Sequence, residues 1–356
     1  MSAPSYSDES YWQDRFLSKS TPFEWLHDGK ASLVRPLLDH LDSIHHARHH
    51  LASSTSSSPS PPSPRVLHIG VGSSKLSLDL LSHYRARGWD PKGIVNWDFA
   101  QSAIQAAIEI EKEFSQYQPL MSYHRVDLLS WPSVSQALGL DLERDLGSIQ
   151  GSPLLFDAIL DKSTTDSIST GVDLHFTLTD AIPTSGRPSF DDHLSLEKRA
   201  QRSPALKTLL SSLSALQGSE ADPRGLILSP VHILSLHLAD LTRKGSRWFV
   251  LSYSASRFRD VLHFPERGTE ETRWPWQIDE TAQVEAVDLP QSQQQEAQQP
   301  PDRPFETANR CPAEVDDQKT GRRRRRRKKG CKDDQGGPSI VHTPSVCHWF
   351  YCLSRI

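Results

Sequence analysis

The sequence has few cysteines and no long apolar run. Four of its 356 residues are cysteine, and all lie near the C-terminus, at Cys311, Cys331, Cys347 and Cys352. Their spacing matches no zinc-binding pattern and nothing suggests secretion, so we expect reduced thiols. The sequence contains no run of 18 apolar residues, so no membrane-spanning helix is predicted. The N-terminus lacks a basic and then apolar leader, and no secretory signal is expected.

The composition suits one large domain that carries polar insertions. The net charge is near −4, with 36% hydrophobic and 24% charged residues and 25 prolines. Residues 52–64 are rich in Ser and Pro, and residues 289–342 are rich in Gln, Pro and charge, so neither segment can bury a core. We therefore predict one globular domain with a disordered insert at each place.

A short apolar run ends in a glycine loop at Gly70-Val71-Gly72, and leucines at helical spacing follow it. This pattern predicts a buried strand over 65–69, a tight loop and a helix. Glycine permits close backbone approach, so the loop can accommodate a nucleoside-containing cofactor. Lys75 stands where a dinucleotide fingerprint needs Gly or Ala, and the order of a phosphate loop is absent, so NAD, FAD and nucleoside triphosphates are disfavoured. A strand–turn–helix unit without a ligand is the alternative.

Two further predicted strands end in an aspartate. The strand over 93–98 ends at Asp98, with Phe99 next, and the strand over 123–128 ends with Asp127 and Leu128. A carboxylate at position 98 can accept from both ribose hydroxyls of a nucleoside. One at position 127 can accept from an adenine amino group while Leu128 packs on the ring. Helix capping or a turn is the alternative for each aspartate.

A fourth predicted strand ends at Leu160 and runs into a polar segment, residues 161–166. In open α/β sheets, ligands bind beyond the carboxyl ends of the strands. The four strand ends present, in order, a glycine loop, an acid, an acid and a polar cluster. This ordered set predicts a cofactor site at one edge of a parallel sheet.

The remaining pattern alternates helices and strands. Helices are predicted within 8–50 and over 206–216 and 231–241, and a long polar loop over 171–204. Strands are predicted over 248–253, within 272–287 and over 348–353, the last one antiparallel beside the one before it. Helical spacing also brings together His45, His46, His49 and His50, which we interpret as a solvated helix end and not as a metal site.

Three motifs resemble those of a known family. Residues 161–166, Asp-Lys-Ser-Thr-Thr-Asp, resemble the Glu-Lys-Gly-Thr-Leu-Asp signature of the methyltransferase-like 13 group. Residues 11–16, Tyr-Trp-Gln-Asp-Arg-Phe, resemble its opening Tyr-Trp-(Asp/Glu)-x-Arg-Tyr, and residues 22–25, Pro-Phe-Glu-Trp, resemble its Pro-Tyr-(Asp/Glu)-Trp. The group belongs to the class I S-adenosylmethionine (SAM)-dependent methyltransferases and includes lysine methyltransferases of translation elongation factor 1-alpha.

The resemblance implies an α/β fold with a seven-stranded, mostly parallel sheet and helices on both faces, the Rossmann-like class I methyltransferase fold. It implies a helical segment over 1–51 that closes the cofactor site, a core over 65–288 and a last core strand within 343–356, with the inserts at 52–64 and 289–342 between them. It implies SAM as the cofactor, held by Trp12, Phe16, Trp25, Gly70, Gly72, Asp98, Phe99, Asp127, Leu128 and Lys162. The chain departs from the family pattern at Ser163, Thr165 and Phe16, which concerns the substrate side more than the cofactor.

The activity that the resemblance implies is protein-lysine N-methylation of a translation elongation factor. A lysine ammonium, with a pKa of about 10.4, must lose its proton before the amine attacks a methyl group. Asp161 and Asp166 are the candidate catalytic residues, because either could hold the lysine or help that proton leave, and no general base is assigned. A small-molecule methyltransferase and an inactive SAM-binding scaffold are the alternatives.

The predicted partner is a protein substrate, with elongation factor 1-alpha as the implied example, and the chain is predicted to be a cytoplasmic monomer without a membrane partner. Residues 322–329 form a run of eight arginines and lysines. Such a run serves as a nuclear-import signal or a nucleic-acid tether, or it is a solvated loop. The neutral-to-acidic remainder disfavours a broad nucleic-acid-binding face.

Overall fold

The computed structural model describes residues 5–18, 26, 28–53, 61–115, 118–139, 155–176, 195–200, 203–217, 226–259, 274–285 and 347–356. Predictions for Trp25, for the run at 322–329 and for Cys311 and Cys331 therefore lie outside the described residues. The two described cysteines, Cys347 and Cys352, are free thiols.

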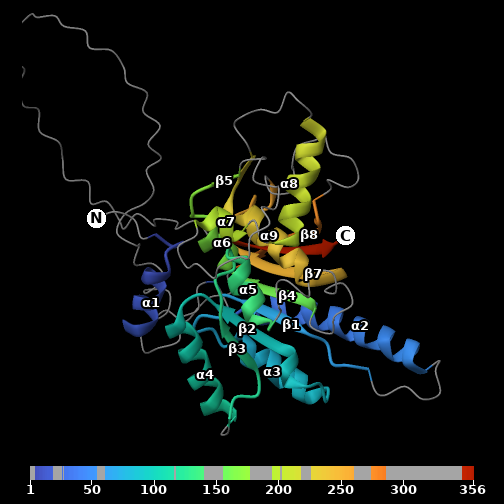
Figure 1. The fold of residues 1–356 in the computed structure, drawn as a ribbon. Helices are drawn as coiled ribbons and strands as arrows, with labels where there is room; N and C mark the ends of the chain where they lie inside the picture. The colour runs from blue at the N-terminus through green and yellow to red at the C-terminus, as the bar shows by residue number, and fades with distance from the viewer. Residues whose placement is uncertain are drawn as a thin grey trace, which may run out of the picture.

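One seven-stranded sheet forms the centre of the molecule, with the strand order β3-β2-β1-β4-β7-β9-β8 (Figure 1). Its strands are β1 (Val66–Ile69), β2 (Ile94–Asp98), β3 (Ser122–Arg125), β4 (Phe156–Lys162), β7 (Thr242–Ser252), β8 (Trp276–Glu285) and β9 (Cys347–Arg355). Strands β3, β2, β1, β4 and β7 pair in parallel, and β9 pairs antiparallel with both of its neighbours. The predicted fold, a mostly parallel Rossmann-like sheet, is confirmed.

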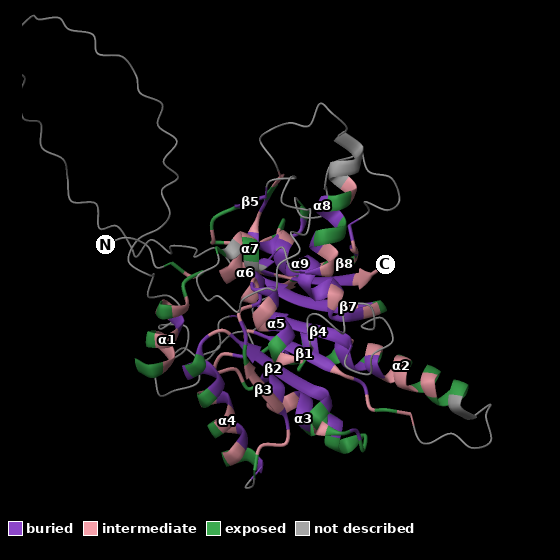
Figure 2. Ribbon diagram, in the orientation of Figure 1, coloured by how far each residue is buried: buried purple, intermediate pink, exposed green. Residues whose placement is uncertain are grey.

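The last strand lies inside the sheet and not at its edge. The prediction that β9 returns antiparallel beside the sixth strand is confirmed, because Val284 of β8 pairs with His348. On its other side β9 also pairs with β7, where Val250 lies opposite Tyr351. Its central residues are buried because strands flank it on both sides, which accounts for their aromatic and apolar character (Figure 2).

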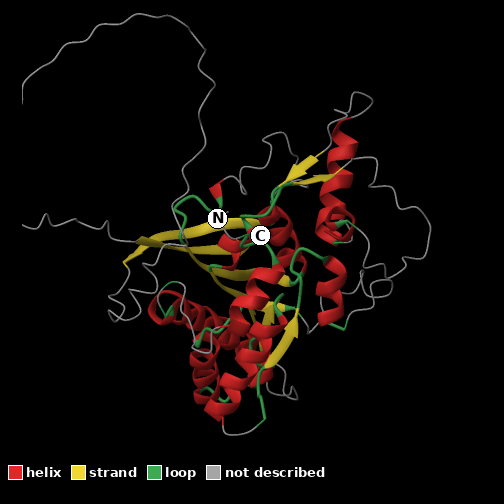
Figure 3. Ribbon diagram, turned by 90° about the vertical axis from the view of Figure 1, so that its left-hand side faces the viewer, coloured by secondary structure: helices red, strands yellow, loops and turns green. Residues whose placement is uncertain are grey.

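Helices cover both faces of the sheet (Figure 3). One face packs on a π-helical turn, η1 (Lys30–Val34), and on α2 (Arg35–Ser53) and α3 (Leu76–Ala86). The other packs on α5 (Trp131–Ala137), α8 (Pro204–Gln217) and α9 (Pro230–Asp240). Side chains alternate between the two cores along a strand, as Val66 and Leu67 do in β1, because strand residues point to opposite faces in turn. The predicted helices over 206–216 and 231–241 are confirmed as α8 and α9.

The other helices lie around this frame. They are α1 (Glu9–Ser18), a short 3₁₀ turn η2 (Pro91–Gly93), α4 (Gln101–Ser115), α6 (Thr164–Ile168) and α7 (Leu196–Ala200). Helix α1 packs against α4, where Trp12 forms a small apolar cluster with Ala100 and Ala103, separate from the two main cores. Among the described residues, no helix combines the length and the apolar content needed to cross a bilayer.

The prediction of a long loop over 171–204 is wrong in part. Residues 174–176 form β5 (Leu174–Phe176), which pairs antiparallel with β6 (Leu226–Leu228) in a separate two-stranded sheet, and α7 follows. Strand β5 forms because Leu174 and Phe176 are buried while His175 between them is exposed. Such an alternation over three residues is too short to recognise in a sequence.

The insert predicted over 52–64 is also wrong at its end. The backbone carbonyl of Pro64 accepts a hydrogen bond from the Tyr84 hydroxyl at 3.1 Å, and Ser63 Oγ accepts from the Asp90 backbone N–H at 2.9 Å. Pro64 is buried as a result. These contacts fix the chain just before β1 begins.

Candidate functional site

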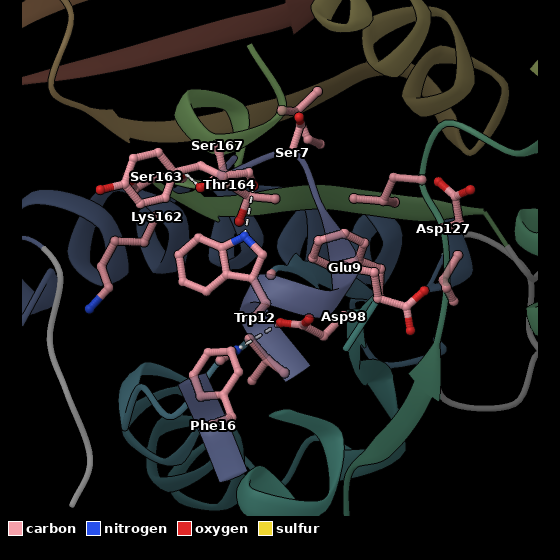
Figure 4. A pocket seen from close by; sticks show the side chains of 18 of the residues that line it. Ser7, Glu9, Trp12, Phe16, Asp98, Asp127, Lys162, Ser163, Thr164 and Ser167 are labelled. Carbon is pink, nitrogen blue, oxygen red and sulfur yellow. Dashed lines mark hydrogen bonds between the residues drawn. The ribbon is translucent and has the colours of Figure 1, made fainter. Parts of the chain in front are cut away.

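A cavity of about 280 Å³ opens at the carboxyl end of the parallel strands (Figure 4). The N-terminal segment supplies one wall, and the ends of β1, β2, β3 and β4 supply the rest, as the edge rule for open sheets predicts. The sequence-predicted residues that line it are Trp12, Phe16, Gly70, Gly72, Asp98, Phe99, Asp127, Leu128 and Lys162. The structure therefore brings together every predicted cofactor-binding residue except Trp25, which lies outside the described residues.

The glycine loop is shaped by its protein neighbours. Gly70 has φ 62°, and a Cβ there would lie 1.9 Å from the Thr164 hydroxyl oxygen. That hydroxyl donates a hydrogen bond to the Ile69 carbonyl at 2.9 Å, so Thr164 is fixed against the loop. Gly72 has φ 51°, and a Cβ there would lie 3.2 Å from Phe16. Glycine is required at position 70 because the turn after β4 packs directly on the loop, a reason that the sequence did not suggest.

Asp98 is a buried carboxylate at the tip of β2. Its Oδ1 accepts from the Ala100 N–H at 2.9 Å, and its Oδ2 accepts from the Gly72 N–H at 3.0 Å. Burial raises the pKa of Asp98 to about 6, the backbone hydrogen bonds oppose that rise, and the nearby Glu9 carboxylate adds to it. The capping alternative is wrong, because α4 begins at Gln101 and Asp98 instead holds the N–H of Ala100 in a turn before that helix. Asp98 also lines the cavity.

The third strand, predicted over 123–128, ends at Arg125, and Asp127 lies in the turn that follows it. Its Oδ1 accepts from the Leu129 N–H at 3.0 Å, and its own N–H donates to Ser133 Oγ at 3.0 Å. The turn predicted as an alternative is therefore present, and Asp127 lines the cavity as well. Leu128 next to it is buried. In Figure 4 Asp127 lies on the opposite side of the cavity from Lys162, with Trp12 between them.

The N-terminal helix is fastened to the core by polar contacts. The Gln13 side chain accepts from the Ser102 N–H at 3.1 Å, and the Ser102 hydroxyl donates to the Gln13 carbonyl at 3.0 Å. Trp12 stacks on Phe16 with ring centroids 5.9 Å apart, and its indole N–H donates to the Tyr6 carbonyl at 2.7 Å. Helix α1 therefore holds two aromatic rings against the cavity.

The turn after β4 departs from ordinary backbone geometry. Ser163 has φ 70°, and no other non-glycine residue of the described part has a positive φ. A left-handed conformation costs a non-glycine residue roughly 1–2 kcal/mol. The signature that residues 161–166 resemble has glycine at this position, and the backbone of Ser163 has a conformation that favours glycine. Its neighbour Lys162 is 8% exposed and lines the cavity.

The two candidate catalytic carboxylates do not line the cavity. Asp161 is fully buried and accepts from the Thr164 N–H at 2.9 Å and from the Thr165 N–H and hydroxyl. Burial raises its pKa to about 7, while the hydrogen bonds from Thr165 and Thr164 oppose that rise and the neighbouring Asp166 adds to it.

Asp166 links the turn after β4 to the end of β7. It accepts from the Ser163 hydroxyl at 3.1 Å, from the Ser252 hydroxyl at 2.6 Å and from the Tyr253 N–H at 3.1 Å. Arg257 forms an ion pair with it at 2.7 Å. We therefore expect Asp166 to position Ser163 and not to contact a substrate.

Sequence reasoning missed several lining residues, including Tyr6, Ser7 and Ser167. Tyr6 and Ser7 precede α1, and a segment without periodicity carries no signal. In α2 the His45 and His49 rings pack on each other, with centroids 4.9 Å apart. Within the described residues, no group of His, Cys, Asp and Glu is arranged to hold a metal.

No protein-family model and no curated protein matches the chain. Among solved structures, the chain is similar to a SAM-dependent methyltransferase from Anabaena variabilis, with a TM-score of 0.39, 12% identity, and 100% of this chain and 99% of that chain covered. It is similar to a magnesium protoporphyrin IX methyltransferase from Synechocystis with bound SAM, with a TM-score of 0.33, 10% identity, and 79% and 91% covered.

It is also similar to the N-methyltransferase NodS from Bradyrhizobium japonicum in complex with S-adenosylhomocysteine, with a TM-score of 0.32, 11% identity, and 80% and 93% covered.

Proposed function

We propose that this protein is a SAM-dependent methyltransferase and that it methylates a lysine side chain of a protein substrate. One observation carries the proposal: a single cavity is lined by residues from five separate parts of the sequence, Trp12, Gly72, Asp98, Asp127 and Lys162. The family resemblance implies these same residues for SAM, and they lie together around one cavity.

The lining chemistry fits SAM from end to end. Ribose hydroxyls are hydrogen-bond donors. Asp98 is a buried acceptor that already binds two backbone N–H groups, and further donors would stabilise its ionised form. Adenine is flat and apolar on its faces, and Phe99 and Leu128 offer such surface beside the Asp127 acceptor. The methionine carboxylate needs a cation, and Lys162 supplies one on the side opposite Asp127. A volume of about 280 Å³ is close to the lower end of small-molecule sites, roughly 300 Å³.

When bound, SAM supplies a methyl group attached to a positively charged sulfur, and this sulfur is a good leaving group. The chain then has to hold the acceptor amine in line with that methyl group and to exclude water, which accelerates transfer by proximity and orientation. Trp12 and Phe16 exclude water on one side of the cavity because their rings lie against it. Asp161 and Asp166 act in this proposal by holding the turn that carries Lys162 and Ser163, and the lysine proton leaves to solvent.

The same resemblance supports elongation factor 1-alpha as the first substrate to test and the cytoplasm as the place of action. A small-molecule acceptor and an inactive scaffold use the same cavity and are outcomes of the test. The experiment incubates the full chain with methyl-radiolabelled SAM and a cell extract, and then separates proteins from metabolites. The proposal expects label in protein that yields methyllysine on hydrolysis. Label in metabolites alone would favour a small-molecule acceptor, and SAM binding without any transfer would favour the scaffold.

A further inference from the structure

A small sheet stands outside the central one, close to the cavity. Strands β5 and β6 pair with each other, with Leu174 opposite Leu228 and His175 opposite Ile227. Figure 3 shows this strand pair apart from the main sheet. Leu174 and Leu228 are buried in the main apolar core, which anchors one face of the pair. Ile227 on the other face is 53% exposed.

The outer edges of this sheet have no backbone partner among the described residues. The ladder joins β5 to β6 and to no other strand, and no turn or loop hydrogen bond reaches residues 172–176 or 226–228. Open edges present a row of N–H and C=O groups that another extended chain can pair with. Two exposed side chains beside them are apolar, Val172 at 81% and Ile227 at 53% exposed, and Asp173 and His175 are exposed as well.

The open edge begins at the rim of the cavity. Ile168 and Ser167 line the cavity, and residues 169–171 connect them directly to Val172. A Cβ at Gly171 would lie 3.4 Å from the Cβ of Ser7, which also lines the cavity. Figure 1 shows β5 and α6 on the same side of the molecule. An extended chain advances about 3.3 Å per residue, so a strand laid on this edge brings its neighbouring side chains to the cavity within a few residues.

We propose that this edge docks an extended segment of the protein substrate, which adds a strand to β5 or β6 and so delivers its lysine to the cavity. The inference rests on the proposed function and names the form in which the substrate is recognised. Strand addition takes affinity from the main chain and specificity from side-chain contacts. Val172 and Ile227 suit an apolar residue of the segment, and the exposed carboxylate of Asp173 suits a segment with basic residues. A small molecule has no backbone to pair with such an edge.

The test places a charge on the exposed apolar surface without touching the cavity. The variant carries Val172→Lys and Ile227→Lys, and both sites are exposed, so the fold should tolerate it. The matched control is Phe114→Lys, which changes a side chain that is 48% exposed at the end of α4. Each protein is assayed with radiolabelled SAM and the proteins of a cell extract, and its SAM affinity is measured by calorimetry.

At protein-substrate concentrations below saturation, we expect the double variant to label protein at least about tenfold more slowly, because it loses two anchoring side chains of the interface. Its SAM affinity and its melting temperature should not change. The control should label at the rate of the parent chain. Equal labelling by the double variant and the parent would overturn the docking edge while leaving the methyltransferase proposal standing. Label in metabolites alone would overturn the edge and the protein substrate together, and a parent chain that binds no SAM would overturn the proposed function itself.

Hydrogen exchange distinguishes strand addition from simple surface contact. The labelled protein, purified from the extract, is added to the full chain. Amides within 172–176 or 226–228 should then exchange more slowly, because a paired edge hides its N–H groups from solvent. Protection confined to other parts of the chain would overturn the proposal.

Discussion

The Oδ2 atom of Asp98 accepts a hydrogen bond from the backbone N–H of Gly72 at 3.0 Å. The glycine loop after β1 and the acid at the tip of β2 are therefore one unit, although 26 positions separate them in the sequence. This bond fixes the loop beside a carboxylate that lines the cavity. The bond explains why the glycine loop and Asp98 belong to the same site. It also explains why the pKa of Asp98 can report on ligand binding there.

Affinity for SAM should depend on pH through Asp98. Burial raises the pKa of this carboxyl to about 6 from the usual 3.8. Ribose hydroxyls donate to the ionised form, so binding favours loss of the proton and lowers the pKa in the complex. Affinity should be highest above pH 6 and should fall as pH drops through 6, to about tenfold weaker at pH 5 than at pH 7. Calorimetric titrations at several pH values measure this.

The Asp98→Asn variant is the control for this pH dependence. It removes the titrating group and keeps the side-chain volume, so its weaker affinity should be flat between pH 5 and pH 7. A flat profile in the parent chain would show that Asp98 does not meet the ligand. A sloping profile in the variant would assign the titration to another group.

Replacing Trp12 with alanine should weaken SAM binding more than it lowers stability. Trp12 belongs to a small cluster with Ala100 and Ala103, apart from the two main cores, and its ring lines the cavity. A cation over an aromatic face gains about 0.5–2 kcal/mol, and the affinity should fall by about that amount. Leu17→Ala on the same helix is the control, since Leu17 is 70% exposed. A large drop in melting temperature with unchanged affinity would make Trp12 a packing residue only.

Replacing Asp166 with asparagine distinguishes a positioning role from a catalytic one. Asp166 accepts from Ser163, Ser252 and Arg257, and hydrogen bonds to a charged group contribute about 1.5–3 kcal/mol. We expect a lower melting temperature and a modest loss of methyl transfer that appears mainly in KM. A loss of kcat by more than about a hundredfold at unchanged stability, the range for acid–base groups, would instead make Asp166 a proton acceptor.

Deleting residues 295–337 should leave the melting temperature and SAM affinity unchanged. Glu285 at the end of β8 pairs with Cys347 at the start of β9, so a short connection can join the two strands. The composition of the deleted segment is unable to bury a core. A marked loss of stability would show that the segment is structural. An unchanged ratio of nuclear to cytoplasmic protein would rule out nuclear import through the basic run.

The central strands could be predicted because both of their faces are buried, and a strand buried on both faces contains a continuous apolar run. Every residue of β1 and β4 is buried, and the middle of β4, residues 158–160, is an apolar run, as a strand that is buried on both faces requires. Strands β5 and β6 could not be predicted, because each has three residues and their pairing joins distant segments. The position of β9 between β7 and β8 was equally hidden, since an aromatic strand shows burial but not its neighbours.

The strand-end residues of the site could be predicted because parallel strands bring their carboxyl ends to one edge. The environment of the two candidate carboxylates could not. Asp161 and Asp166 lie within four positions of Lys162 in the sequence, yet their hydrogen-bond and ion-pair partners hold them outside the cavity lining. Arg257 contacts Asp166 although 91 positions separate them in the sequence, and no local sequence pattern predicts such a contact.

Calorimetric titration of SAM into the parent chain and into Asp98→Ala at neutral pH tests whether the cavity beside Asp98 is a SAM-binding site. We expect one saturable site in the parent chain and an affinity weakened by about 1.5–3 kcal/mol in the variant, the range for hydrogen bonds to a charged group. Phe114→Ala, remote from the cavity, should bind as the parent does. No saturable binding in the parent chain, or equal affinity in a folded Asp98→Ala protein, would overturn the proposed SAM site.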